Sequence, residues 1–269
     1  MCEHISSAIS RRKLLESAGA MAIGVAMATR STSAFARGGP RHGKTAVSMP
    51  ATMKVYRSGP GKVYFAPHHS ETTCVQAALA VIKKRGGKLV QIINGGRRDI
   101  IFRLNDVEYG FDPNRIFTAS GIKATLINKK IRGNYSPEAY QAVHDFAQQV
   151  LFILREMRSG TLIALHNNTT GAYSVLSYAS GGKLASQASA VNVNSEMSPD
   201  DFFLVTTRRF FTHLKVAEYN VVLQSMAKMT DDGSMSVYCA LRGIRYVNVE
   251  ARSGHLAVQT KMIEALSGI

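Results

Sequence analysis

The sequence has few cysteines, few acidic residues and no apolar run long enough to cross a membrane. Three cysteines in 269 residues exclude a scaffold built on disulfide bonds. The apolar stretch from Ala18 to Ala28 spans only 11 residues, whereas a membrane span needs about twenty. We therefore expect neither a disulfide-rich fold nor a stable membrane anchor.

The first 36 residues have the features of a twin-arginine signal peptide. Arg11 and Arg12 form the arginine pair, the apolar stretch follows them, and Ala34-Phe35-Ala36 offers the small residues that a signal peptidase requires. We predict cleavage before Arg37 and a periplasmic or secreted location. The twin-arginine route exports folded proteins, which allows a metal to be inserted before export.

The low acidic content leaves the chain strongly basic. It has 33 Lys and Arg against 18 Asp and Glu, a formal net charge of +15, which becomes +13 without the predicted signal. Such a charge favours anionic partners, either an acidic substrate or the anionic cell wall, although a generic basic surface explains it equally well. Nucleic acid is less favoured, because the sequence shows no binding motif and export would remove the protein from the nucleoid.

Two cysteines remain after the signal, Cys74 and Cys239. They could pair in an oxidising compartment. Two separate buried thiols are the favoured interpretation, because Cys74 falls on the core side of a predicted helix.

Residues 37–60 mix Gly, Pro, Lys, Arg and Ser without an apolar period, which predicts a flexible leader before a single domain over 61–269. Ser70 is expected to cap a helix that stops at Gly86-Gly87, and Asn105-Asp106 to form the turn of a hairpin. A long helix should begin at Pro137 and end at Gly160. The expected strands are 62–66, 88–93, 99–104, 107–111, 161–165, 202–206, 220–223 and 246–249, and a last helix covers 256–266.

Strands that alternate with helices predict an α/β fold: a single domain with a mixed, mostly parallel twisted sheet and helices on both faces. In such sheets ligands bind beyond the carboxyl ends of the strands. His68, His166 and Glu250 each follow a predicted strand directly. Three segments far apart in the chain therefore point to one edge of the sheet.

The pattern H-x-x-E at His68 and Glu71 places an imidazole at a strand end and a carboxylate in the first helical turn. The pattern is common by chance, and a Glu near a helix N-terminus can simply favour the helix dipole. His166 would supply the second nitrogen of a site with two histidines and one carboxylate, the usual ligands of a catalytic zinc ion. His69 is the rival of His68, but the residue three positions after it is Thr72. The four histidines without such a partner are interpreted as surface or supporting residues: His42, His144, His213 and His255.

Three further groups could carry chemistry. A carboxylate at Glu250 would be costly to bury at the end of an apolar strand, unless it pairs with Arg252 or Arg245 or has a function such as general base. Asn114-Arg115 in the turn after Asp112-Pro113 is suited to hold a substrate carboxylate, and Arg97 or Arg98 to stabilise an oxyanion. A solvated surface turn is the alternative for both arginine groups.

In this order, the residues resemble the zinc metallocarboxypeptidase superfamily over about Tyr64 to Gln259. The resemblance implies one Zn²⁺ per chain on His68, Glu71 and His166. It further implies that Glu250 is the general base, that Asn114 and Arg115 bind the substrate carboxylate, and that Arg97 or Arg98 polarises the carbonyl. Tyr238 and Tyr246 stand too close to Glu250 to match the tyrosine that digestive members bring into the pocket.

Together with the predicted signal peptide, the resemblance implies an exported zinc hydrolase that cleaves an amide bond next to a free carboxylate, for example in a cell-wall stem peptide. The turn Asp112-Pro113-Asn114-Arg115 is also similar to that of the succinylglutamate desuccinylase and aspartoacylase branch, which implies an N-acyl amino acid as the alternative substrate. A zinc-containing binding module without turnover is a third possibility, against which a general base at Glu250 argues.

Overall fold

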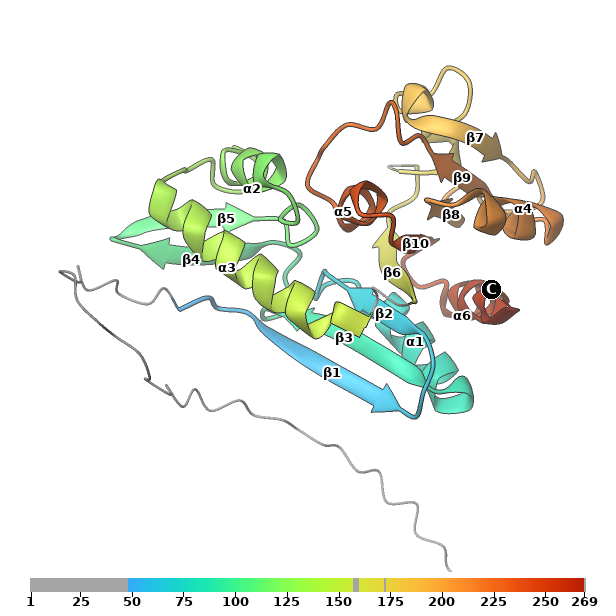
Figure 1. Ribbon diagram of the computed structural model, residues 1–269, viewed down its shortest axis with the longest axis horizontal. Coiled ribbons are helices and arrows are strands. Elements are labelled where there is room, and N and C mark those ends of the chain that lie inside the picture. Colours follow the sequence, from blue (N-terminus) through green and yellow to red (C-terminus); the bar gives the residue numbers. More distant parts are fainter. Residues whose placement is uncertain (1–47, 157–159, 172, 269) are drawn as a thin grey trace, which may run out of the picture. The chain divides into compact units, whose positions relative to one another are not determined.

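A mixed sheet of eight strands forms the centre of the computed structural model, which describes residues 48–156, 160–171 and 173–268 (Figure 1). The strand order is β1-β3-β2-β6-β10-β8-β9-β7. The four neighbouring strands β3, β2, β6 and β10 run parallel to one another, and β8 runs parallel to β9. The pairs β1–β3, β10–β8 and β7–β9 are antiparallel. The strands are β1 Thr52–Ser58, β2 Val63–Ala66, β3 Gly87–Ile93, β6 Thr161–Asn168, β7 Ala188–Asn192, β8 Phe202–Val205, β9 Val221–Gln224 and β10 Arg245–Arg252.

Helices cover both faces of this sheet, and each face has its own apolar core. Residues of α1, α4 and α6 pack on one face. Residues of α2, α3, α5 and the separate hairpin β4–β5 pack on the other. The predicted α/β fold, with a mostly parallel mixed sheet between helices, is confirmed. The bounds are β4 Ile100–Leu104, β5 Val107–Phe111, α1 Thr72–Arg85, α2 Ala119–Leu126, α3 Pro137–Ile153, α4 Arg208–Val216, α5 Met235–Leu241 and α6 Leu256–Ala265.

Local sequence signals explain the best-predicted elements. Pro137 stands in the first turn of α3, and the Ser136 hydroxyl accepts a hydrogen bond of 3.1 Å from the amide of Ala139. Val143, Ala147 and Val150 then recur at helical spacing and are buried. The hairpin turns where predicted, at Asn105 and Asp106, whose φ angles of 49° and 62° suit a tight turn of two residues.

Three predicted boundaries are wrong. Residues 52–58 of the expected flexible leader form β1, which pairs with β3 along its whole length, so the sheet begins before Lys62. Ser70 is not the cap of α1, since Glu71 occupies that position without a side-chain capping bond. The helix α3 ends at Ile153, and does not continue to Gly160.

Two other observations bear on function. Cys74 and Cys239 are free and buried in the cores on opposite faces of the sheet, so the interpretation as two separate thiols is confirmed. Among the described residues, no helix has both the length and the apolar character that a membrane crossing requires. The predicted signal peptide, residues 1–36, lies outside the described residues.

Candidate metal centre

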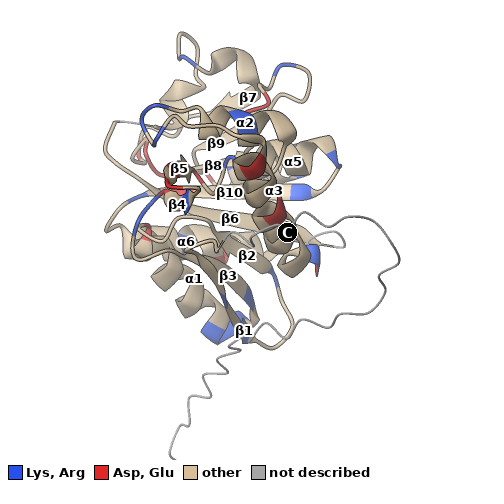
Figure 2. Ribbon diagram, turned by 90° about the vertical axis from the view of Figure 1, so that its left-hand side faces the viewer, with Lys and Arg blue, Asp and Glu red and all other residues tan. Residues whose placement is uncertain are grey.

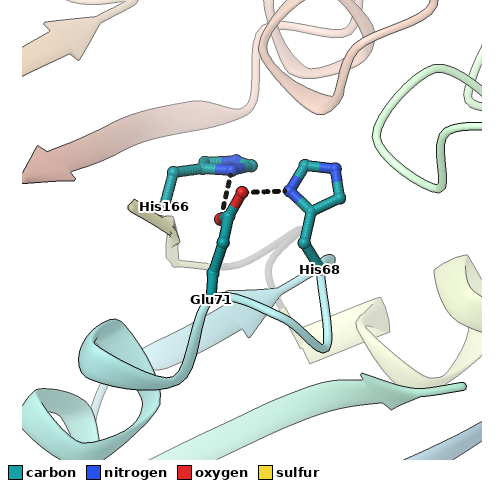
Figure 3. A group of neighbouring side chains, drawn as sticks. All are labelled: His68, Glu71 and His166. Carbon is teal, nitrogen blue, oxygen red and sulfur yellow. Dashed lines mark hydrogen bonds and ion pairs between the residues drawn. The ribbon is translucent and has the colours of Figure 1, made fainter. Parts of the chain in front are cut away.

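Three buried side chains meet beyond the central strands of the sheet. His68 follows β2 after a single proline, Glu71 caps the N-terminus of α1, and His166 lies near the carboxyl end of β6 (Figure 3). One possible ligand atom from each lies within 4.8 Å of those from the other two. His68, Glu71 and His166, which the sequence predicts as metal ligands, therefore form one group that could bind a metal.

The Glu71 carboxylate lies between the two imidazole rings, as Figure 3 shows. Its Oε1 is 2.8 Å from Nδ1 of His68, and its Oε2 is 3.1 Å from Nδ1 of His166. The backbone amide of Asn167 also donates a hydrogen bond to Oε2 at 3.1 Å. Burial would raise the pKa of Glu71, but His166 and His68 outweigh it and hold the pKa well below its usual range. Glu71 is therefore an anion at neutral pH.

The Nδ1 atom of His68 has the environment expected of a metal ligand. It is buried and has no hydrogen-bond partner, because its close contact with Glu71 lacks hydrogen-bond alignment. The charge of Glu71 offsets part of the cost of burying this nitrogen without a hydrogen bond, and a bound cation would offset the rest. With the imidazole of His166 and the carboxylate of Glu71, it forms the donor set of a catalytic zinc site, so the residues present fit the ion that the sequence implies.

Asp112 supports His68 from the opposite side of the ring. Its Oδ1 is 2.8 Å from Nε2 of His68, which leaves Nδ1 free to face Glu71 and His166. Burial opposes a charged imidazole, but Asp112 and Glu71 outweigh burial and raise the pKa of His68 to about 9. The sequence contained Asp112 only as part of a turn, and its contact with a histidine 44 residues away gave no local signal.

Glu250 lies beside His166 on the neighbouring strand. The two residues are paired in the parallel register of β6 and β10, which places their side chains on the same face. Glu250 is buried and accepts a hydrogen bond of 3.0 Å from Asn248, and no salt bridge to Arg245 or Arg252 is present. Burial raises the pKa of Glu250, only partly offset by His166. Both strands continue past His166 and Glu250, which were expected at strand ends.

The structure distinguishes between the two candidate arginines. The Arg98 guanidinium is paired with Glu71 and is 3.4 Å from Oδ2 of Asp112. Arg97 is exposed and forms no ion pair with the described residues of the group. His69, the rival ligand, is already used: its Nδ1 accepts hydrogen bonds from the amides of Asn94 and Gly96, at 2.9 and 2.8 Å. His69 thus holds the loop that presents Arg98.

Asn114 contacts the ring nitrogen of His166 that does not face Glu71, and Arg115 follows it in the turn. The Asn114 amide nitrogen is 3.4 Å from Nε2 of His166, and its oxygen accepts from the amide of Met235 at 3.2 Å. Arg115 is paired with Asp232 at 3.0 Å, and both side chains are partly exposed. Exposed ion pairs of this kind are weak, so this contact holds Arg115 only loosely.

A cavity of about 400 Å³ adjoins this group. Arg98, Asp112 and Arg115 line one part of it, and residues of α2 and of the segment after it, including Lys130, line another. Tyr238 and Tyr246 are buried in the apolar core. Tyr173, which no sequence pattern singled out, has its hydroxyl 2.7 Å from that of Tyr178. Burial raises the pKa of Tyr173, and the charge of Glu250 adds to this rise as it does for Tyr178 and Tyr246.

Comparison with known proteins gives remote structural likenesses only. No family model and no curated protein matches the chain. A candidate metallopeptidase from Shewanella denitrificans is similar at 12% identity, 82% of this chain, 81% of that chain and a TM-score of 0.41. A succinylglutamate desuccinylase from Vibrio parahaemolyticus is similar at 13% identity, 83% and 75% coverage and a TM-score of 0.43. These similarities are too remote to indicate a function, so any inference about function rests on the side chains of this chain.

Proposed function

We propose that this protein is a zinc-dependent hydrolase that cleaves an amide bond next to a free carboxylate. The observation that carries the proposal is the position of Glu250, a buried carboxylate with a raised pKa, beside the buried group of His68, Glu71 and His166. A protein that only binds a ligand gains nothing from this costly buried carboxylate. The position of Glu250 therefore argues against a binding module without turnover.

Glu250 would act as the general base. A carboxylate with a raised pKa accepts a proton more readily than a solvated one, so Glu250 takes the proton of the attacking water molecule. The same carboxyl group then delivers this proton to the nitrogen of the leaving amine. A zinc ion held by His68, Glu71 and His166 would supply the polarisation of the carbonyl and activate the water.

The cationic side chains would bind and orient the substrate. Arg115 offers a planar guanidinium to the free carboxylate once Asp232 is displaced, and the amide of Asn114 lies beside it. Arg98 is close enough to Glu71 to stabilise the oxyanion formed during attack. These residues hold the amide bond between the general base and the metal ligands.

We favour a peptide substrate, such as a cell-wall stem peptide, for a protein exported to the periplasm by the twin-arginine route. The second candidate is an N-acyl amino acid, favoured by the Asp112-Pro113-Asn114-Arg115 turn. The cavity of about 400 Å³ beside Arg115 has room for one amino-acid residue in either case. Assay of the mature protein on matched peptides and acyl amino acids separates the two.

The first experiment is the metal content of the purified mature protein by plasma mass spectrometry. We expect about one zinc ion per chain, lost in a His68→Ala, His166→Ala double variant and retained in a His144→Ala control, whose side chain is exposed on α3. Absence of metal from the wild-type protein, with apo protein that does not take up zinc on dialysis, would sink the proposal.

A further inference from the structure

A second cavity lies at the amino ends of the central strands, opposite the carboxyl ends where the candidate metal centre lies. It has a volume of about 640 Å³. Val63, Thr161 and Arg245 line it, and they are the first residues of the parallel strands β2, β6 and β10. Along β6, His166 stands five residues beyond Thr161, about 16 Å at the usual rise of a strand. This second cavity is therefore separate from the site at which hydrolysis is proposed.

Positive charge dominates the second cavity. Lys62, Arg209 and Arg245 line it against one carboxylate, Glu156. Glu156 is already engaged by Arg57, at 2.8 and 2.9 Å, and by Lys88 at 3.4 Å. Arg209 and Arg245 form no ion pair with any residue in the described part of the chain. Burial and the charge of Arg245 both lower the pKa of Lys62, a sign that these cations are crowded together.

The N-terminus of α4 adds unpaired donors to the same cavity. Thr207, which also lines it, is the N-cap of α4, but its side chain makes no capping hydrogen bond. Its hydroxyl oxygen is buried without a hydrogen-bond partner, and the first turn of α4 contains no acidic residue. Backbone amides at a helix N-terminus and a free hydroxyl are the donors that bind the oxygen atoms of an anion.

We propose that this second cavity binds a phosphate group through Arg209, Arg245, Thr207 and the first turn of α4. Two guanidinium groups, a hydroxyl and helix amides suit the several acceptor oxygens of a phosphate better than the two of a carboxylate. The volume of about 640 Å³ exceeds what a free phosphate ion fills. We therefore expect the phosphate to be carried on a larger polar molecule.

This site would give the excess basic charge a specific role beyond hydrolysis. Basic residues occur on many elements of the ribbon and acidic ones on few (Figure 2). A generic basic surface attracts any anion weakly, whereas a cavity with directed donors should discriminate between anions. An anion bound at the amino ends of the strands would leave the edge with His68 and Glu250 free for substrate.

The test is a titration of the mature, metal-loaded protein with inorganic phosphate and with glycerol 3-phosphate. Calorimetry and the amide NMR signals of α4 measure the binding. We expect saturable binding of both, tighter for glycerol 3-phosphate, and weaker by about tenfold or more in an Arg209→Gln, Arg245→Gln double variant. Thr207→Val should weaken binding by about threefold, the loss of one hydrogen bond. The zinc content of both variants should match that of the wild type.

A matched control removes the same charge away from the proposed site. Lys215→Gln, Lys261→Gln changes two exposed residues, in the last turn of α4 and on α6, that do not line the second cavity. Unchanged binding in this control supports the proposal. Equal weakening in both double variants would mean that net charge alone causes the effect, which would contradict the proposal. Absence of saturable binding by the wild type would also contradict it. Binding of inorganic phosphate alone would contradict the expectation of a larger phosphorylated ligand.

Discussion

The two ends of the same three strands differ in how they handle charge. At the carboxyl ends of β2, β6 and β10, buried acids and histidines neutralise one another through short contacts, as Glu71 and Asp112 do around His68. At the amino ends, Arg209 and Arg245 face a cavity without an ion-pair partner among the described residues. The positive net charge of the chain is therefore seen at the amino ends of these strands, and not at the carboxyl ends, where opposite charges are paired.

This difference shows where the protein would give up stability for the proposed chemistry. A buried carboxylate such as Glu250 costs free energy in the folded state, and the raised pKa reflects that cost. Exposed arginines such as Arg209 cost little. Substitutions at the carboxyl ends should therefore change activity and metal binding strongly, whereas those at the amino ends should change anion binding and, slightly, stability.

The largest effect is expected from Glu250→Gln. The amide keeps the shape and the contact with Asn248 but cannot accept a proton, so hydrolysis should fall by about a thousandfold with zinc content unchanged. Steady-state kinetics and metal analysis on the same preparation check both points. Glu196→Gln, an exposed carboxylate, is the control. A fully active Glu250→Gln enzyme would sink the mechanism.

The next effect in size is expected from Asp112→Asn. Losing the carboxylate that orients His68 should lower zinc affinity by about 10–100-fold, as is usual for the partner of a ligating histidine. Competition with a chelator measures it. Asp99→Asn, which lines the same cavity without a hydrogen bond to His68, should leave zinc affinity within about twofold. Equal affinities in the two variants would contradict the role of Asp112.

Arg115→Gln and Arg97→Gln sharpen the assignment of the substrate contacts. Arg115→Gln should raise the KM for a substrate with a free carboxylate by about tenfold or more, the loss of a charge-assisted hydrogen bond. The carboxamide analogue of the substrate should be affected much less. Arg97→Gln should have no effect, since Arg97 is exposed and forms no ion pair with the described residues of the group. A larger effect of Arg97→Gln than of Arg115→Gln would contradict the assignment of the substrate carboxylate to Arg115.

The sequence predicted those parts of the fold whose signals are local. Pro137 after Ser136, the turn at Asn105 and Asp106, and apolar strands followed by His68 or His166 each depend on a few neighbouring residues. The short elements α2, α4, α5 and β7 escaped prediction, because 5 to 9 residues hold only about two periods of a helical or strand pattern.

The remaining features of the site depend on contacts between distant segments. Asp112 reaches His68 only because the hairpin β4–β5 ends beside β2, and the hydroxyl of Tyr173 meets that of Tyr178 in an irregular segment after β6. The choice between Arg97 and Arg98 is made by a loop in which Gly95 and Gly96 have φ angles of 73° and 78°. No periodicity predicts the path of such a loop.

The smallest effect is expected from Arg245→Gln at the amino ends of the strands. The pKa of Lys62 is lowered by burial and then by Arg245, so the charged form of Lys62 destabilises the fold at neutral pH. This penalty disappears only as the pH rises toward 10.5, the ordinary pKa of lysine, and Arg245→Gln removes part of it. Thermal unfolding at pH 7 should show a gain of about 0.3 kcal/mol that fades in high salt. Arg208→Gln should show no such gain, and a loss of stability in Arg245→Gln would mean that Arg245 stabilises the fold through a contact stronger than its repulsion of Lys62.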